Sequence, residues 1–408
     1  MDVTSLTRRS MLGALGCGVA APALIGCGVA APLDSDLVIT EIKSFVMDDG
    51  FFVKITADNG VSGWGETDAG RPSLFQTYLH DAMAKRVLGR DPFDTSPILE
   101  NIFYREHDFG PGGALANTLA GIDIALWDLK ARVLEVPIYK LLGGQYRDKM
   151  PIYGSYGTKR WTRMTPEQAA DKAEKFADRG FRTVKCRMQV RESHLDPVED
   201  RTIEYLRTIK NRLRGTDVEL FTDINNGYSV ARAIQIGRVL QDELGFRFFE
   251  EPCSDQHHKH TAEVVDALDL AIIAGEKEYT PFQLQELITY ANPDYINPDV
   301  IKAMGITGMH KIGVLSQVNQ KPIIMHNTRP VISTAASLQL AASYPIIGPF
   351  MEFVDVDDHA DMIDAADEYL TYKDGHLLIP STPGLGIEIN EEKITERSSS
   401  IRVAEFDD

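Results

Sequence analysis

Apolar and polar residues alternate along residues 37–66, with the period of two that half-buried β-strands require. The stretches LVITEIKSFVM and FFVKITA flank Asp48-Asp49-Gly50, and Asn59-Gly60 then leads into VSGWGE. Turn residues between alternating runs are typical of β-hairpins. We therefore predict an antiparallel meander at the start of the folded chain.

A helical period replaces this alternation between residues 115 and 133. The apolar residues that recur three or four positions apart are Leu115, Leu119, Ile122, Leu126, Leu129 and Val133. This spacing places them on one face of a helix. The glycines of LLGG (141–144) end a further helix. Residues 34–148 are accordingly predicted to form a small α+β domain.

From residue 150 onward, short apolar runs alternate with amphipathic helical segments. Thr165, Pro166 and Gln168 start the first of these helices with a capping box and a proline at the first helical position. The eight apolar runs are MPIYGS, FRTVKCRM, VELFTDIN, FRFFEEP, LAIIAGE, DYINPD, KPIIMHN and GPFMEF. Strands joined by helices in this way predict a parallel (β/α) barrel over residues 149–370. A doubly wound open sheet is the alternative, but no glycine-rich phosphate loop follows the first strand.

The C-terminal segment, residues 371–408, carries a second hairpin signal. Its stretch YLTYKDGHLLIPSTPGLGIEI turns at Asp374-Gly375. We expect this hairpin to return to the small N-terminal domain, so that the end of the chain completes that domain.

The first 33 residues resemble an export signal rather than a folded domain. Arg8-Arg9 precedes the stretch GALGCGVAAPALIGCGVAAP, which is too short and too rich in glycine for a membrane span. Together these features predict a twin-arginine signal. LIGC (24–27) also resembles a lipobox that would make Cys27 an acylated first residue, whereas Ala21-Pro22-Ala23 offers ordinary cleavage. We expect an exported protein, either periplasmic or anchored to the membrane as a lipoprotein.

Composition excludes several classes of partner. The 408-residue chain is 43% apolar, enough for a large core, and its formal net charge is −18. A protein this acidic is not expected to bind nucleic acid or an anionic membrane surface. An anionic ligand must therefore meet positive charge supplied by its own site. Cys186 and Cys253, the two cysteines outside the leader, are too few for a disulfide framework and lack metal-site spacing.

Polar residues at the ends of the predicted barrel strands carry the chemical signal. Lys185 and Arg187 end the second strand and share one face, because they lie two residues apart. The later strands end with Asp223, Glu250, Glu276, Asp299, His326 and Glu352. The steps from the first of these are 27, 26, 23, 27 and 26 residues, each the length of one strand–helix unit. In a barrel such residues converge at the C-terminal mouth, where these enzymes place their chemistry.

Three of these strand ends are acids on adjacent strands, Asp223, Glu250 and Glu276. As bare anions they would repel one another strongly in a barrel mouth of low dielectric constant. A bound cation resolves this repulsion, and all-oxygen ligands with open positions suit Mg²⁺. Any one acid could instead form a salt bridge, and Asp299 in NPDV could belong only to a turn. Three acids at matched strand ends nevertheless predict a metal site.

In their order along the chain, these motifs resemble the enolase superfamily, in its mandelate racemase/muconate lactonizing enzyme-like subgroup. The stretches that carry the resemblance are GWGE (63–66), GIDIALWDLKA (121–131), LLGG (141–144), TDIN (222–225), EEP (250–252), GE (275–276) and PGLGIEI (383–389). The resemblance spans about residues 37–395 and implies a (β/α)7β barrel with an α+β capping domain. It also implies that Asp223, Glu250 and Glu276 bind Mg²⁺, with the first rather than the second acid of EEP as the ligand.

The same resemblance implies a reaction, the removal of a proton α to a carboxylate. His326 is then the expected base, with Asp299 hydrogen-bonded behind it to fix its tautomer and raise its basicity. Lys185 is expected to help hold the substrate carboxylate. Glu352 is expected to donate a hydrogen bond to that carboxylate, which requires Glu352 to be protonated. Asn225, two residues after a metal ligand, is expected to contact the substrate or the base.

One departure from the family pattern narrows the reaction. Racemases of this subgroup carry a second lysine as a base opposite the histidine, and Arg187 stands there in this chain. Arginine stays protonated and is a poor base, although it binds carboxylates and hydroxyls well. Racemisation needs a base on each side of the substrate, so a site with one base disfavours it. Such a site favours dehydration of an acid sugar to a 2-keto-3-deoxy acid, with His326 as base and then acid. Arg187 could instead only balance the acids of the metal site, which restores no second base.

A second departure concerns the cover of the site. The long loop that the family inserts between the first two strands is reduced here to Asp48-Asp49-Gly50. Cover must therefore come from residues 68–78, from His107 and residues 109–113, or from barrel loops. The run DQHHKH (255–260) is predicted to be a polar loop at the mouth; a substrate contact or a second metal site is an alternative.

Two other functions remain open from the sequence. One is an epimerase or cycloisomerase of a sugar acid, and the other is an exported protein that binds a sugar acid without converting it. In each case the expected partner is a small-molecule sugar acid. We also expect the protein to form a homo-oligomer.

Overall fold

The structure is a computed structural model that describes residues 37–48, 50–68, 70–159, 161–190, 195–354 and 370–406. The predicted leader, residues 1–33 with Arg8-Arg9 and Cys27, lies outside the described residues. None of the helices within these ranges combines the length and the apolar character needed to cross a membrane.

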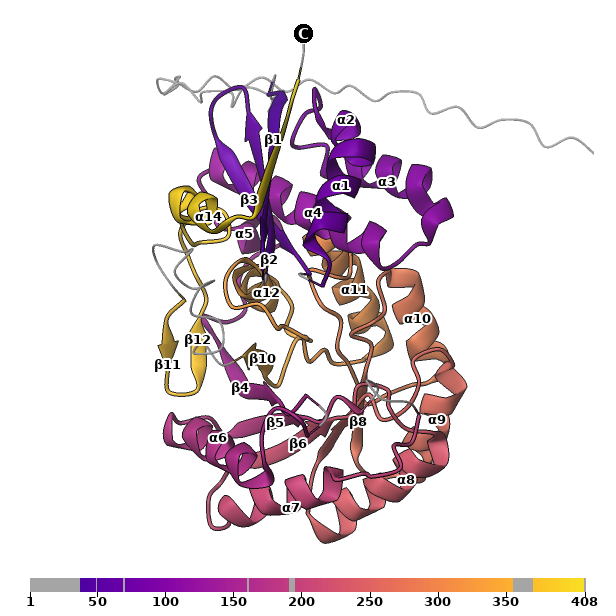
Figure 1. Ribbon diagram of the computed structural model, residues 1–408. Coiled ribbons are helices and arrows are strands. Elements are labelled where there is room, and N and C mark those ends of the chain that lie inside the picture. Colours follow the sequence, from indigo (N-terminus) through magenta and orange to yellow (C-terminus); the bar gives the residue numbers. More distant parts are fainter. Residues whose placement is uncertain are drawn as a thin grey trace, which may run out of the picture. The chain divides into compact units, whose positions relative to one another are not determined.

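An antiparallel four-stranded sheet begins the described chain (Figure 1). It has the order β13-β1-β2-β3. Its strands are β1 (Ile39–Met47), β2 (Gly50–Ala57), β3 (Ser62–Thr67) and β13 (Ser400–Glu405). Strands β1 to β3 form the predicted meander, and the C-terminal strand pairs with β1. The end of the chain therefore completes the capping domain, as expected from the sequence.

The hairpin at Asp374-Gly375 does not join that sheet, so this part of the prediction is wrong. Its strands β11 (Tyr372–Lys373) and β12 (His376–Leu378) pair with each other, and β12 pairs with the first residues of barrel strand β4 (Lys149–Gly157). The barrel neighbours of β4 pair with it only from Ile152 onward. The hairpin thus satisfies ladder groups at the start of β4 that would otherwise be open.

Helical segments of the capping domain pack against its sheet and against one another. They are α1 (Pro72–Tyr78), the π-helical turn η1 (Leu79–Met83), α2 (Ala84–Val87), α3 (Thr95–Glu106), the short turn η2 (His107–Phe109), α4 (Ala114–Val133) and α5 (Ile138–Leu141). Helix α4 is buried on almost every side rather than along the single predicted stripe. The reason is that it contacts β3 and also barrel helix α11 (Gly305–Asn319), where Asp123 accepts hydrogen bonds from the backbone N–H (2.8 Å) and hydroxyl (2.5 Å) of Thr307.

The glycines of the GWGE stretch allow α4 to approach β3 closely. A Cβ atom on Gly63 would overlap the carbonyl oxygen of Ala125, and a Cβ atom on Gly65 would overlap that of Gly121. Only a residue without a side chain leaves room for this contact between a strand and a helix backbone. Part of the family motif therefore has a steric cause in the capping domain.

A closed parallel barrel forms the second part of the chain, which rules out the doubly wound alternative. Its strands after β4 are β5 (Thr183–Arg187), β6 (Glu219–Asp223), β7 (Phe248–Glu250), β8 (Ala271–Ala274), β9 (Tyr295–Ile296) and β10 (Met351–Val354). They pair in chain order, and β10 closes the ring on β4. The seventh stave, near Ile323 and His326, joins its neighbours through isolated bridges. The expected (β/α)7β barrel is confirmed.

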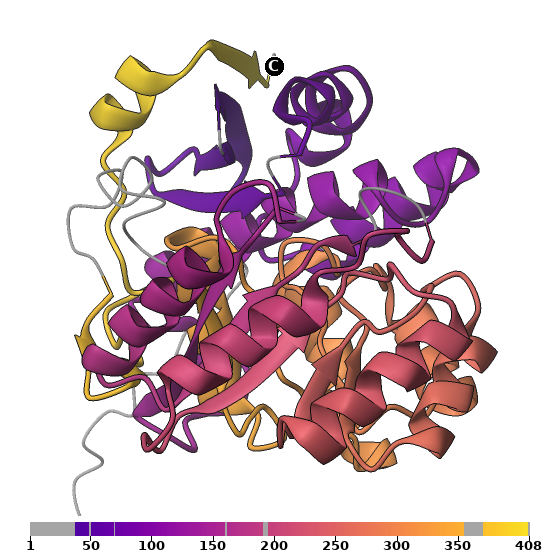
Figure 2. The same cartoon turned by 60° about the horizontal axis from the view of Figure 1, so that its bottom comes forward.

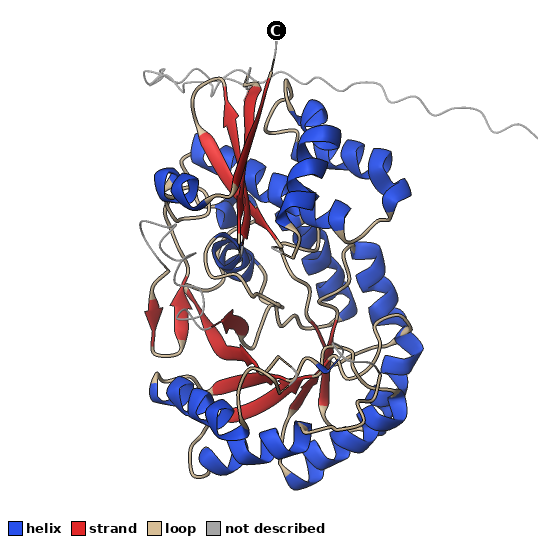
Figure 3. Ribbon diagram, viewed as in Figure 1, coloured by secondary structure: helices blue, strands red, loops and turns tan. Residues whose placement is uncertain are grey.

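Helices surround the barrel strands, as Figures 2 and 3 show. They are α6 (Pro166–Asp178), α7 (Thr202–Arg212), α8 (Val230–Arg238) with its π-helical extension η4 (Val239–Glu243), α9 (His258–Ala267), α10 (Pro281–Tyr290), α11 and α12 (Ile332–Ser343); α14 (Glu391–Arg397) precedes β13. Helix α6 has the predicted capping box. The Thr165 hydroxyl accepts from the Gln168 N–H (3.3 Å), and the Gln168 side chain accepts from the Thr165 N–H (2.8 Å).

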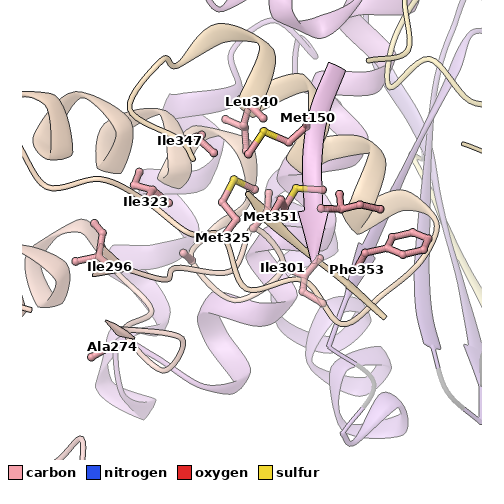
Figure 4. Close-up of a cluster of buried hydrophobic side chains, with 14 of the residues drawn as sticks. Met150, Ala274, Ile296, Ile301, Ile323, Met325, Leu340, Ile347, Met351 and Phe353 are labelled. Atoms are coloured by element: carbon pink, nitrogen blue, oxygen red, sulfur yellow. The ribbon is translucent and has the colours of Figure 1, made fainter. Parts of the chain in front are cut away.

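Two apolar clusters hold the barrel. Figure 4 shows Met325, Met351 and Leu340 within a cluster that joins the barrel wall to α12. Inside the barrel, Tyr153 and Phe221 meet edge to face with ring centroids 4.8 Å apart, and further aromatic rings adjoin them. This aromatic layer fills the interior below the mouth, so that the strand ends are held by a packed core.

We predict that Gly65→Ala lowers the free energy of unfolding by at least about 3 kcal/mol, because the new methyl group collides with the α4 backbone rather than with a flexible side chain. Gly70→Ala is the matched control, since a Cβ atom there lies 4.0 Å from its nearest neighbour, and its cost should stay below about 1 kcal/mol. Urea unfolding followed by circular dichroism measures both. Equal stabilities of the two variants would contradict the steric account of GWGE.

Candidate active site at the barrel mouth

Three buried carboxylates meet at the ends of neighbouring strands. Asp223 ends β6, Glu250 ends β7 beside it in register, and Glu276 follows β8. One oxygen from each lies within 4.8 Å of the others. Among the described residues, this is the one group of three or more His, Cys, Asp or Glu side chains that meets such a geometry. The arrangement offers an all-oxygen site for a divalent cation.

The backbone separates the two acids of the EEP stretch. Glu251 adopts the left-handed region with φ of 43°. Its carboxylate accepts a hydrogen bond from Asn226 (2.8 Å) and pairs with Lys277. Glu250, and not Glu251, is therefore the acid that lies with Asp223 and Glu276.

Lys185 is the central cation of the mouth, and its side chain is fully buried. Its Nζ donates to both carboxylate oxygens of Glu250 (2.9 Å each) and lies 3.0 Å from Glu352 Oε1. Burial alone would lower the pKa of Lys185, but the carboxylates of Glu250 and Glu352 raise it well above its ordinary value. Burial conversely raises the pKa of Glu250 to about 8, against the opposing effect of Lys185.

His326 and Asp299 form a close pair across two staves. His326 Nδ1 lies 2.6 Å from Asp299 Oδ2, and its Nε2 lies 2.7 Å from Glu276 Oε2. Burial would lower the pKa of His326, but the Glu276 carboxylate is the main group that raises it, to about 10. In this arrangement the imidazole is a cation held between two acids, with the Asp299 contact fixing its orientation.

The surroundings of Glu352 favour its charged form, whereas the role expected from the resemblance needs it protonated. Burial would raise its pKa, but Lys185 and then His326 lower it to about 2. Its Oε2 also accepts a hydrogen bond from the Asn327 N–H (3.1 Å). Glu352 lies within β10 as its second residue rather than at the predicted strand end, and its charge depends on the two cations that fold against it.

The two expected substrate-binding residues lie in different settings. Arg187 is half-buried beside Asp223 in strand register, and its buried Nε has no hydrogen-bond partner among the described residues. Asn225 instead binds Asp223, donating from its backbone N–H and its side-chain amide (2.7 Å each). Asn225 therefore orients one of the three carboxylates rather than facing open space.

Sequence reasoning missed several polar residues of the mouth. Asn297 donates to Glu250 Oε1 (3.1 Å), and Lys277 Nζ lies 3.1 Å from Glu276 Oε1. Asn297 had a readable signal, because it precedes Asp299 by two residues and would share its face of the predicted strand. Lys277 offered none beyond following Glu276, because its direction depends on the loop conformation after β8.

Two capping loops reach the mouth. Asp68, at the start of the expected cover 68–78, pairs with Arg329 at 3.3 Å. Gly112, in the expected cover 109–113, leaves no room for a Cβ atom against the ring of Tyr279. The side chain of His107 is 53% exposed and bonds the carbonyl oxygen of Tyr104 at 2.8 Å, away from these contacts.

The DQHHKH run is a helix start rather than only a loop, because α9 begins at His258. His258 Nε2 lies 3.7 Å from Glu278 Oε1. Within the described part of the chain, none of the three histidines of the run belongs to a cluster of three possible metal ligands. The prediction of a polar loop is thus corrected, and the geometry favours neither alternative.

Two models of known domain families match successive parts of this chain. The family model described as "Mandelate racemase / muconate lactonizing enzyme, N-terminal domain" matches residues 38–143. The model described as "Enolase C-terminal domain-like" matches residues 168–393. Together they cover the capping domain and most of the barrel.

Individual relatives are enzymes of sugar acids. The chain is 27% identical to a D-galactonate dehydratase of Variovorax paradoxus, over 85% of this chain and 90% of that protein. It is 29% identical to a D-galactarolactone cycloisomerase of Agrobacterium fabrum, over 84% of this chain and 90% of that protein. These relatives are a lyase and an isomerase, the two enzyme classes expected from the sequence.

A solved structure is also similar. It is a mandelate racemase/muconate lactonizing protein from Paracoccus denitrificans complexed with magnesium, with 31% identity and a TM-score of 0.81. The similarity covers 91% of this chain and 99% of that chain. The barrel and the cap therefore have the fold of this solved structure.

Proposed function

The chain belongs to the mandelate racemase / muconate lactonizing enzyme family of the enolase superfamily, and on this basis we propose that it is a Mg²⁺-dependent dehydratase of an acid sugar. The observation that carries the proposal is a single histidine base site beside a buried triad of carboxylates. Arg187 occupies the position where a racemase of the family would need a second base. The product would be a 2-keto-3-deoxy acid.

Asp223, Glu250 and Glu276 would hold the Mg²⁺. They fit this ion because they offer only oxygen atoms, lie within 4.8 Å of one another and are almost fully buried. When bound, Mg²⁺ would supply positive charge that stabilises the negative charge developing on the substrate carboxylate as the α-proton leaves. Lys185 adds a fixed positive charge to the same place and binds a carboxylate oxygen of the substrate.

His326 would carry the proton. Its Nε2 takes the α-proton from the substrate, while Asp299 holds Nδ1–H and stabilises the imidazolium. The same imidazolium then returns a proton to the β-hydroxyl, which leaves as water, and the enol becomes the 2-keto acid. Glu276 is the main group that raises the pKa of His326. If the Glu276 carboxylate held a metal ion instead, the pKa of His326 would fall and the ring would be a free base.

A cycloisomerase is the second candidate, and the similarity to the D-galactarolactone cycloisomerase supports it. That reaction class also needs an enediolate-type site but breaks a ring C–O bond instead of releasing water. Product analysis separates the two functions, since only dehydration yields a 2-keto-3-deoxy acid from an open-chain sugar acid.

We predict that Mg²⁺ raises the melting temperature of the wild-type protein in a saturable way, because a ligand that binds only the folded state stabilises it. Glu250→Gln should weaken Mg²⁺ binding by about tenfold or more, since it removes a charged ligand. Glu251→Gln is the matched control, because Glu251 pairs with Lys277 and Asn226, and its Mg²⁺ affinity should stay within about threefold of wild type. Thermal-shift titration measures the Mg²⁺ affinity of both variants, and a titration in the presence of Ca²⁺ tests whether the two ions compete for the site. Loss of binding in Glu251→Gln alone would contradict the assignment.

A second prediction concerns the base. His326→Asn should lower the rate of keto-acid formation by about 10²–10⁴-fold, the usual contribution of a general base, while Mg²⁺ still binds. His258→Asn serves as the control, because His258 lies beside Glu278 rather than with the triad. The assay is formation of 2-keto acid from hexonates, pentonates, aldarates and uronate-derived acids, with α-proton exchange followed in D₂O. Unchanged turnover by His326→Asn would rule out this base, and exchange without loss of water in the wild type would indicate an epimerase.

A further inference from the structure

A second pair of cations lies at the mouth, opposite the one that the proposed reaction uses. Lys185 and Arg187 end β5, the second stave of the ring, whereas Lys302 follows β9, the sixth stave. In a ring of eight staves these positions face each other across the mouth. Arg329 follows His326 on the seventh stave and reaches the same side, where it pairs with Asp68. The two pairs of cations therefore lie on opposite sides of the proposed metal site.

Arg329 has more hydrogen-bond donors than partners. Its side chain is 14% exposed, and its Nη2 donates to Asp68 Oδ1 at 3.3 Å. Its Nε is buried and has no partner among the described residues. A guanidinium carries five N–H donors, and buried donors normally find acceptors. This single long contact leaves the buried Nε–H of Arg329 unsatisfied.

Lys302 also has hydrogen-bond donors without partners among the described residues. Its side chain is 12% exposed, and its nearest acid is Asp299, with Nζ 3.9 Å from Oδ2, beyond hydrogen-bond distance. Asp299 is itself engaged with His326 at 2.6 Å. Burial would lower the pKa of Lys302, but Glu276 and Asp299 raise it, so the ammonium stays charged. Within the described part of the chain, no hydrogen bond is made by this ammonium.

One acid of the cap meets this side of the mouth. Burial would raise the pKa of Asp68, but Lys302 and then Arg329 lower it, and Arg329 pairs directly with its carboxylate at 3.3 Å. Among the described residues, Asp68 bonds only Nη2 of Arg329, which leaves the ammonium of Lys302 and the buried Nε–H of Arg329 without an acceptor. A second anion with two oxygen atoms would complete both groups, and Arg329 presents the planar fork that binds a carboxylate at two points.

We propose that Arg329 and Lys302 bind a second carboxylate of the substrate, at the end remote from the carboxylate held by Lys185, so that the enzyme prefers sugar diacids to sugar monoacids. The inference rests on the proposed function, because it uses the same bound substrate and the same mouth. It also answers the charge problem of the chain: with a net charge of −18, a dianion needs positive charge at both of its ends.

The competing explanation is a purely structural ion pair, in which Arg329 and Asp68 only tie the cap to the barrel. The two explanations predict different effects of one pair of variants on the preference for diacids. If Arg329 binds substrate, Asp68 competes with the substrate for it, so Arg329→Gln and Asp68→Asn should shift the preference for diacids in opposite directions. If the pair only ties the domains together, both variants should have the same effect.

The test compares aldonates with aldarates of the same configuration, such as D-galactonate with galactarate and D-gluconate with D-glucarate, in the presence of Mg²⁺. For the best pair, kcat/KM of the diacid should exceed that of the monoacid. Arg329→Gln should lower this ratio by about ten- to hundredfold, the value of charge-assisted hydrogen bonds. Arg329→Lys should restore part of it, and Asp68→Asn should raise it. Lys311→Gln, which removes an exposed lysine paired with Glu100, is the control and should leave it unchanged.

The outcomes separate this inference from the proposed function. If monoacids are converted as well as diacids, or if Arg329→Gln and Asp68→Asn shift the ratio together, the diacid site is wrong while the dehydratase stands. If no acid is converted, the dehydratase is wrong, and calorimetric binding of the same acid pairs then decides on the diacid site. The diacid site is supported if the wild type binds the diacid more tightly than the monoacid and Arg329→Gln loses this difference. Equal binding of the diacid and the monoacid by the wild type overturns it.

Discussion

Repulsion among three buried carboxylates is the constraint on which the rest of the mouth depends. Asp223, Glu250 and Glu276 are almost fully removed from water, and at such short separations unpaired anions would be very costly. Three cations offset this repulsion in the structure, Lys185 on Glu250 and both His326 and Lys277 on Glu276. Lys185 and His326 belong to the reacting groups of the proposed function, so charges that stabilise the fold are also charges that a substrate and a divalent ion would engage.

The barrel makes this arrangement possible because it fixes where the acids sit. Aromatic side chains fill the interior directly below, and Lys185 lies over the rings of Tyr153 (5.3 Å) and Phe221 (5.7 Å). An ammonium in that position is favoured by the ring faces as well as by the acids. The strand ends cannot spread apart to relieve their repulsion, since the packed core beneath them is nearly incompressible. The repulsion is instead offset by positively charged side chains that lie against the acids.

Regular spacing explains why so much of the fold was predictable from the sequence. The capping box of α6 and the placing of polar residues at or near the strand ends from Asp223 to Glu352 follow from local period or from matched strand–helix units. Contacts between elements were not predictable. The β11–β12 hairpin pairs with β4 because of where β10 and β5 begin their pairing, and α4 is buried on both sides because the barrel adds a second neighbour.

The same distinction holds within the site. Residue types at strand ends indicate an acid, a lysine or a histidine, but the protonation of Glu352 depends on Lys185 and His326, which come from other staves. Lys302 and Arg329 lie three residues beyond Asp299 and His326, in loops whose course no period describes. Direction in such loops is set by tertiary contacts, here by the approach of Asp68 from the cap.

The position of Asp68 connects the two domains to substrate choice. Strand β1 ends at Met47 and β2 begins at Gly50, and other parts of the cap meet the mouth, Asp68 on Arg329 and Gly112 on Tyr279. A cap acid that pairs with a barrel arginine neutralises the cation while no substrate is present, which limits the cost of a buried charge. An anionic substrate end would then exchange one carboxylate for another at Arg329. The positive charge and the planar fork of Arg329 would then both contribute to the selection of a second carboxylate.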